Sequence, residues 1–343
     1  MKKQHSLSLG AFFKELKALV KPGYLAAMWP AGGMTLIYMA LACVISLFIS
    51  NILQAMMMSV MLMMYGMASP VTLLFGLLEM IVGLVVLAGV GFYYSFYTTA
   101  TQFAYLDKIE HPDHVVSAGS IWMYFKHLRK NQLWRIILYV GLFAFLWSLP
   151  LTIIGDLVAA YTKNAIAVNA IKILNVIVVA WKSIEYSQAN FLYREKQPQF
   201  LGQSMRRALT ASRRFMGGRK MNYLLVTILF VLLPIVVWIA IFGGLAFYGA
   251  YTAAYALTYI GLALVVLGFA CYSPVVFATG ALFFAKSKED EDIDADFKDT
   301  FKPVAELTGE AFVHEVYTPR KEKKHPTPTV KPEEKKREAK KED

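Results

Sequence analysis

Between Lys21 and Asp107 the chain carries a single charged residue, Glu79. A bilayer core needs about 20 apolar residues per transmembrane helix, so this interval is long enough for two such helices. Four more apolar runs follow, at residues 136–154, 165–180, 223–246 and 257–284. The chain is only 17% charged, whereas soluble domains are about 25% charged. The pattern predicts an all-α membrane protein with six transmembrane helices in three hairpins.

The basic side chains gather on one side of the predicted bilayer. Residues 1–285 hold 21 basic and 8 acidic side chains, and residues 286–343 hold 14 basic and 16 acidic ones. In the first part, the basic residues fall mainly in the arm before the first span and in the loops after the second and fourth spans. Such an excess marks the cytoplasmic side. We therefore expect a multi-pass protein of the cell membrane with both termini cytoplasmic, and we expect no nucleic-acid partner.

The charge distribution divides the chain into three parts. We expect a cytoplasmic amphipathic arm at residues 1–24, a six-span membrane domain at residues 25–285 and a charged cytoplasmic tail at residues 286–343. Residues 321–343 are almost entirely Lys, Glu, Pro and Thr, a composition that cannot bury a core and predicts disorder. Sparse apolar residues between 297 and 317 leave open a short segment that docks on a cytoplasmic protein partner.

Two segments outside the spans have the period of amphipathic helices, residues 9–21 and residues 200–216. In each, apolar side chains share one face and basic side chains lie opposite. Helices of this kind lie in the membrane interface, where Lys and Arg attract anionic lipids. The candidate contacts with inner-leaflet lipid or with a partner are Lys14, Lys17, Arg206, Arg207, Arg213 and Arg214. The plainer interpretation is that these helices only position the bundle.

A third segment, residues 117–130, shares a short motif with the first. Tyr124-Phe125-Lys126-His127-Leu128-Arg129 matches Phe12-Phe13-Lys14-Glu15-Leu16-Lys17 in an aromatic-Phe-Lys-x-Leu-basic pattern. A two-span hairpin follows each copy, and a hairpin also follows the Arg-rich helix. We therefore hypothesise three units of one amphipathic helix and one hairpin, although so short a match also arises by chance.

Two charged residues lie inside predicted spans. Glu79 lies about nine residues from the outer end of the second span, and Lys172 lies about seven residues from the outer end of the fourth. At the helical rise per residue, these positions predict similar depths of about 10–14 Å. Asn169 and Asn175 lie three residues on either side of Lys172, on the same face. Because charges in hydrocarbon usually face a partner inside the bundle, we predict a polar cluster of these four residues. It would be either a structural ion pair or a proton relay or substrate site.

No enzyme signature is evident, although chemistry without a local motif stays open. The chain has no Walker A run, no G-x-S-x-G and no H-E-x-x-H. The segment His111-Pro112-Asp113-His114, with Asp107 and His127 nearby, contains possible ligands for a divalent ion, but a surface turn is the plainer interpretation. We therefore name no catalytic residues, and we expect no cofactor and no resident metal.

Two segments and four residues of the sixth span, all in the second half of the chain, are similar to those of a known family. They are Tyr186-Ser187-Gln188-Ala189-Asn190-Phe191-Leu192, Ser212-Arg213-Arg214-Phe215-Met216-Gly217-Gly218, and Tyr272, Pro274, Thr279 and Phe283. Over residues 180–285 the chain thereby resembles a bacterial integral-membrane family, domain of unknown function nine-seven-five. The resemblance implies a multi-pass plasma-membrane protein and carries over no catalytic residues.

The leading functional hypothesis is a non-enzymatic membrane scaffold or accessory protein that binds anionic lipid and a cytoplasmic partner. Two alternatives stay open. One is a small transporter or export accessory that uses Glu79 and Lys172, and the other is a lipid-modifying membrane enzyme.

Overall fold

The computed structural model describes residues 8–67, 69–130, 133–162, 164–196, 204–289 and 293, and all regular structure in these residues is helical. Among them, six helices are long and apolar enough to cross a membrane: Tyr24–Met64, Pro70–Glu110, Leu133–Thr162, Ala165–Glu195, Lys220–Tyr251 and Tyr255–Glu289. The prediction of an all-α, multi-pass membrane protein is confirmed.

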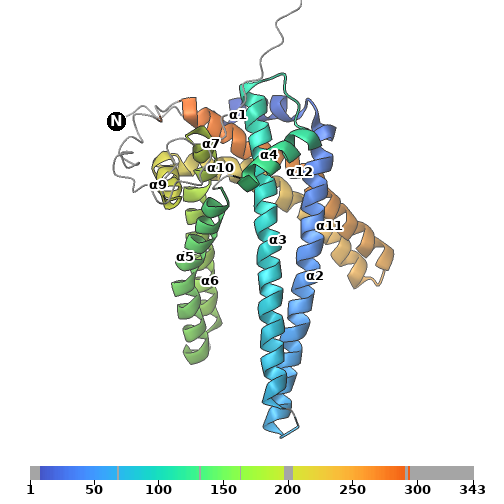
Figure 1. Ribbon diagram of the computed structural model, residues 1–343. Helices are drawn as coiled ribbons and strands as arrows, with labels where there is room; N and C mark the ends of the chain where they lie inside the picture. The colour runs from blue at the N-terminus through green and yellow to red at the C-terminus, as the bar shows by residue number, and fades with distance from the viewer. Residues whose placement is uncertain are drawn as a thin grey trace, which may run out of the picture.

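The long helices form three hairpins that share one end and diverge toward the other (Figure 1). The first hairpin pairs α2 (Tyr24–Met64) with α3 (Pro70–Glu110), and the second pairs α5 (Leu133–Thr162) with α6 (Ala165–Tyr186). The third pairs α12 (Tyr255–Glu289) with a composite span made of α10 (Lys220–Thr227), the π-helix η1 (Ile228–Leu232) and α11 (Leu233–Tyr251). α6 and α12 exceed their predicted apolar runs mainly at the shared end, where they continue into polar sequence, whereas α5 and α11 extend mainly at the opposite end.

Within the part of the chain that the structure describes, four shorter helices lie at the shared end: α1 (Leu9–Val20), α4 (Ala118–Lys130), α7 (Ala189–Glu195) and α9 (Arg206–Phe215) (Figure 1). We call these helices, together with the adjoining ends of the spans, the basic layer. The order α1, α4 and α9, each before a hairpin, agrees with the hypothesis of three units. Leu16 of α1 and Leu128 of α4, which occupy the same place in the shared motif, are both buried.

Local signals in the sequence explain where α1 begins and how it leads into α2. The Ser8 side chain accepts a hydrogen bond from the backbone N–H of Ala11 and so caps the first turn of α1. Gly23 adopts a left-handed conformation (φ +78°), which turns the chain from α1 into α2 at little steric cost. The Lys108 ammonium donates to the carbonyls of Leu19 (2.8 Å) and Pro22 (2.6 Å). It thereby satisfies free carbonyls at the end of α1 and ties that end to α3.

The hydrophobic core lies in the basic layer rather than between the spans. Among the described residues, its largest buried side chains come from seven helices and include Phe12, Tyr105, Phe191, Phe215 and Phe284. The ring of Phe284 lies 5.0 Å from that of Phe191 and 5.5 Å from that of Phe215. In five of the six spans, by contrast, at most 6% of the most apolar stretch is buried. The basic layer therefore holds the hairpins together. The sides of the spans stay exposed on the surface of the structure.

Pro234 explains a cross-link between the two helices of the third hairpin. Because proline has no N–H, it cannot donate to the carbonyl four residues earlier, that of Phe230. The hydroxyl of Tyr272, on α12, donates to this carbonyl at 2.8 Å. Phe230 lies in η1, where the helix is locally wound with five-residue hydrogen bonds. The proline is therefore accommodated by a side chain from the neighbouring helix.

The last helix continues past the predicted boundary at Ala285 and ends at Glu289. Its final turn is bound to the basic layer, because Lys286 pairs with Glu15 of α1 at 3.0 Å and Lys288 with Glu195 of α7 at 2.6 Å. Residues 290–292 and 294–343 lie outside the described residues. The predictions of a disordered tail and of a docking segment concern that part of the chain.

Candidate functional site

The structure does not bring the predicted intramembrane cluster together. Glu79 lies on α3, Lys172 and Asn169 lie on α6, and all three are exposed. The hairpins that carry them diverge (Figure 1), and no salt bridge among the described residues joins Glu79 to Lys172. Asn175 is half-buried and donates to the hydroxyl of Thr152 on α5 at 3.2 Å. Equal depth along two helices was the basis of the prediction, and depth does not determine which hairpins pack together.

The predicted basic contacts lie on the outer faces of α1 and α9. On α9, Ala208, Leu209 and Phe215 are buried in the core, so the opposite face points outward. On α1, Phe12 and Leu16 are buried in the same way. The exposed members of the predicted set are Lys14, Lys17, Arg206, Arg213 and Arg214, and Arg207 is partly exposed. Both helices thus present a basic face at the shared end of the spans.

A buried carboxylate connects the basic layer to α6. The side chain of Glu185 is only 5% exposed and binds the ammonium groups of Lys220 (2.5 Å) and Lys182 (2.9 Å). The hydroxyl of Ser212, on α9, donates to the Glu185 carbonyl at 2.7 Å and accepts from the backbone N–H of Gln188. The two segments that carry the family resemblance therefore contact each other here. Among the described residues, this contact fixes α9 against the α6–α7 turn.

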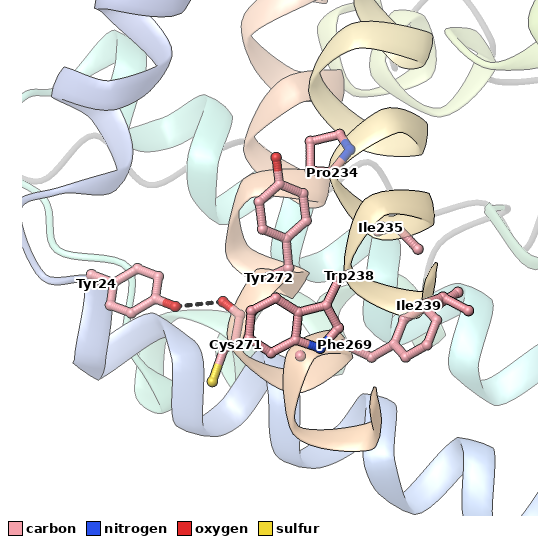
Figure 2. Close-up of a pocket in the computed structure, with 9 residues that line it drawn as sticks. Tyr24, Pro234, Ile235, Trp238, Ile239, Phe269, Cys271 and Tyr272 are labelled. Atoms are coloured by element: carbon pink, nitrogen blue, oxygen red, sulfur yellow. Dashed lines mark hydrogen bonds between the residues drawn. The ribbon is translucent and has the colours of Figure 1, made fainter. Parts of the chain in front are cut away.

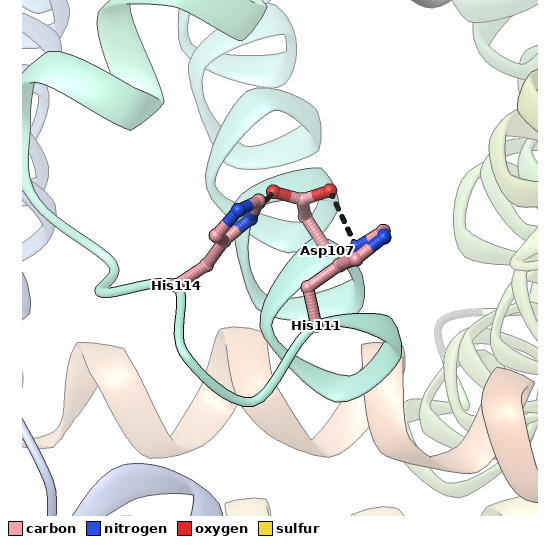
Figure 3. A group of neighbouring side chains, drawn as sticks. All are labelled: Asp107, His111 and His114. Carbon is pink, nitrogen blue, oxygen red and sulfur yellow. Dashed lines mark hydrogen bonds and ion pairs between the residues drawn. The ribbon is translucent and has the colours of Figure 1, made fainter. Parts of the chain in front are cut away.

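A second polar cluster lies where α3 ends, and we call Asp107, His111 and His114 the Asp107 cluster (Figure 3). The Nδ1 atom of His114 lies 2.6 Å from Oδ2 of Asp107, and Nδ1 of His111 lies 3.5 Å from Oδ1. The two imidazole rings stack with their centroids 5.0 Å apart. The Asp107 side chain is 12% exposed, whereas those of His114 and His111 are 32% and 48% exposed. One mostly buried carboxylate is therefore flanked by two accessible imidazoles.

The local sequence explains this convergence. Asp107 and His111 are one helical turn apart on α3, so they share a face. His111 ends the helix in an extended conformation, as expected for a residue before proline. The backbone N–H of His114 then donates to the carbonyl of His111 at 2.9 Å, which closes a turn with Pro112 at its second position. The predicted surface turn is present, and it folds His114 back onto Asp107.

Charged and aromatic groups surround the Asp107 cluster on its inner side. Arg194 of α7 pairs with Glu110 at 3.0 Å and lies 3.9 Å from Oδ1 of Asp107. The phenol of Tyr124, on α4, lies beside this pair. Burial raises the pKa of Tyr124 above its ordinary value of 10.0, and the nearby Arg194 guanidinium opposes that rise. Three helices, α3, α4 and α7, therefore meet at this cluster.

An apolar cavity of about 210 Å³ lies between α11, α12 and the start of α2 (Figure 2). Its three larger polar side chains all donate to backbone carbonyls. The Tyr24 hydroxyl donates to Cys271 at 2.5 Å, and the Trp238 indole donates to Leu264 at 2.9 Å. The Tyr272 hydroxyl donates to the Phe230 carbonyl described above. The cavity therefore presents mainly hydrocarbon surface, which suits an apolar occupant better than a polar substrate.

Comparison with known proteins adds no relative: no protein-family model, curated protein or solved structure matches the chain.

Proposed function

We propose that the protein is a non-enzymatic membrane scaffold or accessory protein of the cell membrane. In this proposal the basic layer faces the cytoplasm, where it contacts anionic lipids of the inner leaflet. Residues 286–343 supply a contact for a cytoplasmic protein partner. The proposed membership of the bacterial family named above is consistent with this assignment and adds no activity to it.

One observation carries the proposal. Amphipathic helices at the shared end of the spans bury their apolar faces in one core and direct their basic faces outward. Each Lys or Arg near an anionic membrane surface contributes about 1 kcal/mol of attraction, which is about a five-fold change in affinity. A rigidly positioned set of basic side chains is therefore suited to select anionic over neutral lipid.

The two alternatives gain less support. A transport role for Glu79 and Lys172 rests on their pairing, and they lie on diverging hairpins. A lipid-modifying enzyme would be favoured by a pocket that gathers Tyr186, Asn190 and Arg213. Asn190 instead donates to the hydroxyl of Thr99, and the apolar cavity is lined by α2, α11 and α12.

Quenching of tryptophan fluorescence by brominated lipids tests the lipid part of the proposal. The full chain would be reconstituted with brominated phosphatidylglycerol or brominated phosphatidylcholine, and the relative affinity of the two lipids measured. We expect a preference for the anionic lipid. It should fall by about five-fold per charge when Arg213 and Arg214 are both replaced by Gln. Lys172→Gln, which removes a positive charge outside the basic layer, is the control and should change the preference little.

The proposal fails if the wild-type protein shows no preference, or if the Arg213→Gln/Arg214→Gln variant keeps it in full. Affinity capture with and without residues 294–343 tests the partner contact separately. A partner retained equally by both forms would contradict docking through the tail.

A further inference from the structure

The Asp107 cluster has the ligand types and the spacing of a metal site. Among the described residues, it is the group in which one atom each from two histidines and a carboxylate lie within 4.8 Å of one another. Zinc bonds of about 2.0–2.2 Å to nitrogen and oxygen place tetrahedral ligands about 3.3 Å apart. His114 Nδ1 lies 2.6 Å from Oδ2 of Asp107 and His111 Nδ1 lies 3.5 Å from Oδ1, so both nitrogens lie near this separation from the carboxylate, each from a different oxygen.

A single hydrogen bond to Asp107 would account for one neighbouring histidine. The presence of two histidines beside the same carboxylate is more typical of a metal site. Both imidazoles direct the same nitrogen, Nδ1, toward the two oxygens of one carboxylate. Their partial exposure leaves an entry path for an ion and room for water ligands. The donors are also held locally: Asp107 lies in the last turn of α3, the His111 N–H donates to the Asp107 carbonyl, and the Pro112 turn positions His114.

The charges around the cluster are compatible with a divalent ion. Asp107 and Glu110 are each negatively charged and Arg194 is positively charged, so these three side chains together contribute a charge of −1. Arg194 is held mainly by Glu110, at 3.0 Å, and lies 3.9 Å from Asp107. At 3.9 Å the contact with Asp107 is an ion pair, longer than a hydrogen bond.

We propose that Asp107, His111 and His114 bind one divalent transition-metal ion of the Zn²⁺ class. Two imidazole nitrogens and one carboxylate oxygen suit Zn²⁺ and its first-row neighbours, whereas Mg²⁺ and Ca²⁺ prefer oxygen ligands alone. The bound ion links the last turn of α3 to the loop that leads into α4. The site thus fixes a junction of the basic layer, and it does not depend on the function proposed above.

Metal uptake by the full chain tests this proposal. The protein would be purified in detergent without a histidine tag, stripped with a chelator and dialysed against ZnCl₂, and the bound zinc measured by mass spectrometry. We expect one Zn²⁺ per chain. Loss of a residue that only hydrogen-bonds a metal ligand weakens metal binding by roughly 10–100-fold. His111→Ala and His114→Ala each remove a ligand itself and should weaken zinc binding by more than that. His127→Ala, which removes an exposed histidine of α4, should bind as the wild type does.

A second readout identifies the ligands and guards against misfolding. Co²⁺ bound to the wild type should give visible absorption bands that disappear in both ligand variants. Because the His111 side chain is 48% exposed, His111→Ala should keep the wild-type elution volume and helix content even if His114→Ala does not. The proposal is overturned if the wild type takes up no zinc, if His111→Ala binds zinc as tightly as the wild type, or if excess Mg²⁺ displaces the zinc.

Discussion

Replacing Gly32 with alanine should force α2 away from α12. A Cβ atom at this position would lie 2.5 Å from the carbonyl oxygen of Ala270, 2.9 Å from its carbonyl carbon and 3.1 Å from its Cα. All three are backbone atoms, so no side chain can rotate out of the way. Ordinary van der Waals contact with a Cβ begins near 3.4 Å, so the helices have to separate locally by about 0.9 Å.

The size of the effect follows from this displacement. A gap of about 0.5–1 Å removes a quarter to a half of each pairwise attraction across it, and overpacking of this kind costs about 1–3 kcal/mol. Alanine also gains up to about 1 kcal/mol over glycine within a helix. A Cβ atom added to the neighbouring Gly33 would meet open space, with no other helix or side chain within 4 Å. Gly33→Ala should therefore gain the helix propensity of alanine without a packing cost. The difference between the two variants therefore isolates the packing cost.

The assay is unfolding of the purified protein by titration with sodium dodecyl sulfate, followed by tryptophan fluorescence. We expect Gly32→Ala to be less stable than Gly33→Ala by about 1–3 kcal/mol. Equal free energies of unfolding for the two variants would show that α2 and α12 do not approach each other as closely as described, and would refute the reasoning.

Two further predictions use the same assay. Tyr272→Phe removes the donor to the Phe230 carbonyl and should destabilise the protein by about 0.5–1.5 kcal/mol. This loss should shrink by about half or more in a Pro234→Ala background, where a backbone N–H is restored, and an unchanged loss would refute the link to the proline. Glu185→Gln leaves Lys182 and Lys220 without their shared carboxylate and should cost about 3 kcal/mol. Lys172→Gln serves as its control, and a cost no larger than that control would count against a structural role for Glu185.

The spans and the basic layer were predictable because each leaves a local signature. Runs of apolar residues predict the six long helices, and the amphipathic period predicts α1. The arrangement of the hairpins was not predictable, because the spans are apolar on all sides and so carry no periodic sign of which face meets which. The proposed meeting of Glu79 and Lys172 rested on depth alone.

The polar groups of the basic layer were partly visible in the sequence. His111 and His114 were recognised as possible ligands on a proline turn, but their approach to Asp107 depends on how that turn folds against α3. Glu185 and Ser212 lie next to or within the segments that carry the family resemblance, yet neither residue type indicates burial. Their role follows from the contact of α9 with the α6–α7 turn, which joins segments far apart along the chain.

The placement of the core in the basic layer has a consequence for biosynthesis. Tyr24, the first residue of α2, bonds to the backbone of Cys271, 247 residues later, and Glu15 of α1 pairs with Lys286. α1 is therefore synthesised long before α12, one of the segments that it packs against. During that interval the membrane surface is the natural resting place for an amphipathic helix. The bilayer surface would then cover the apolar face of α1 until α12 has been made.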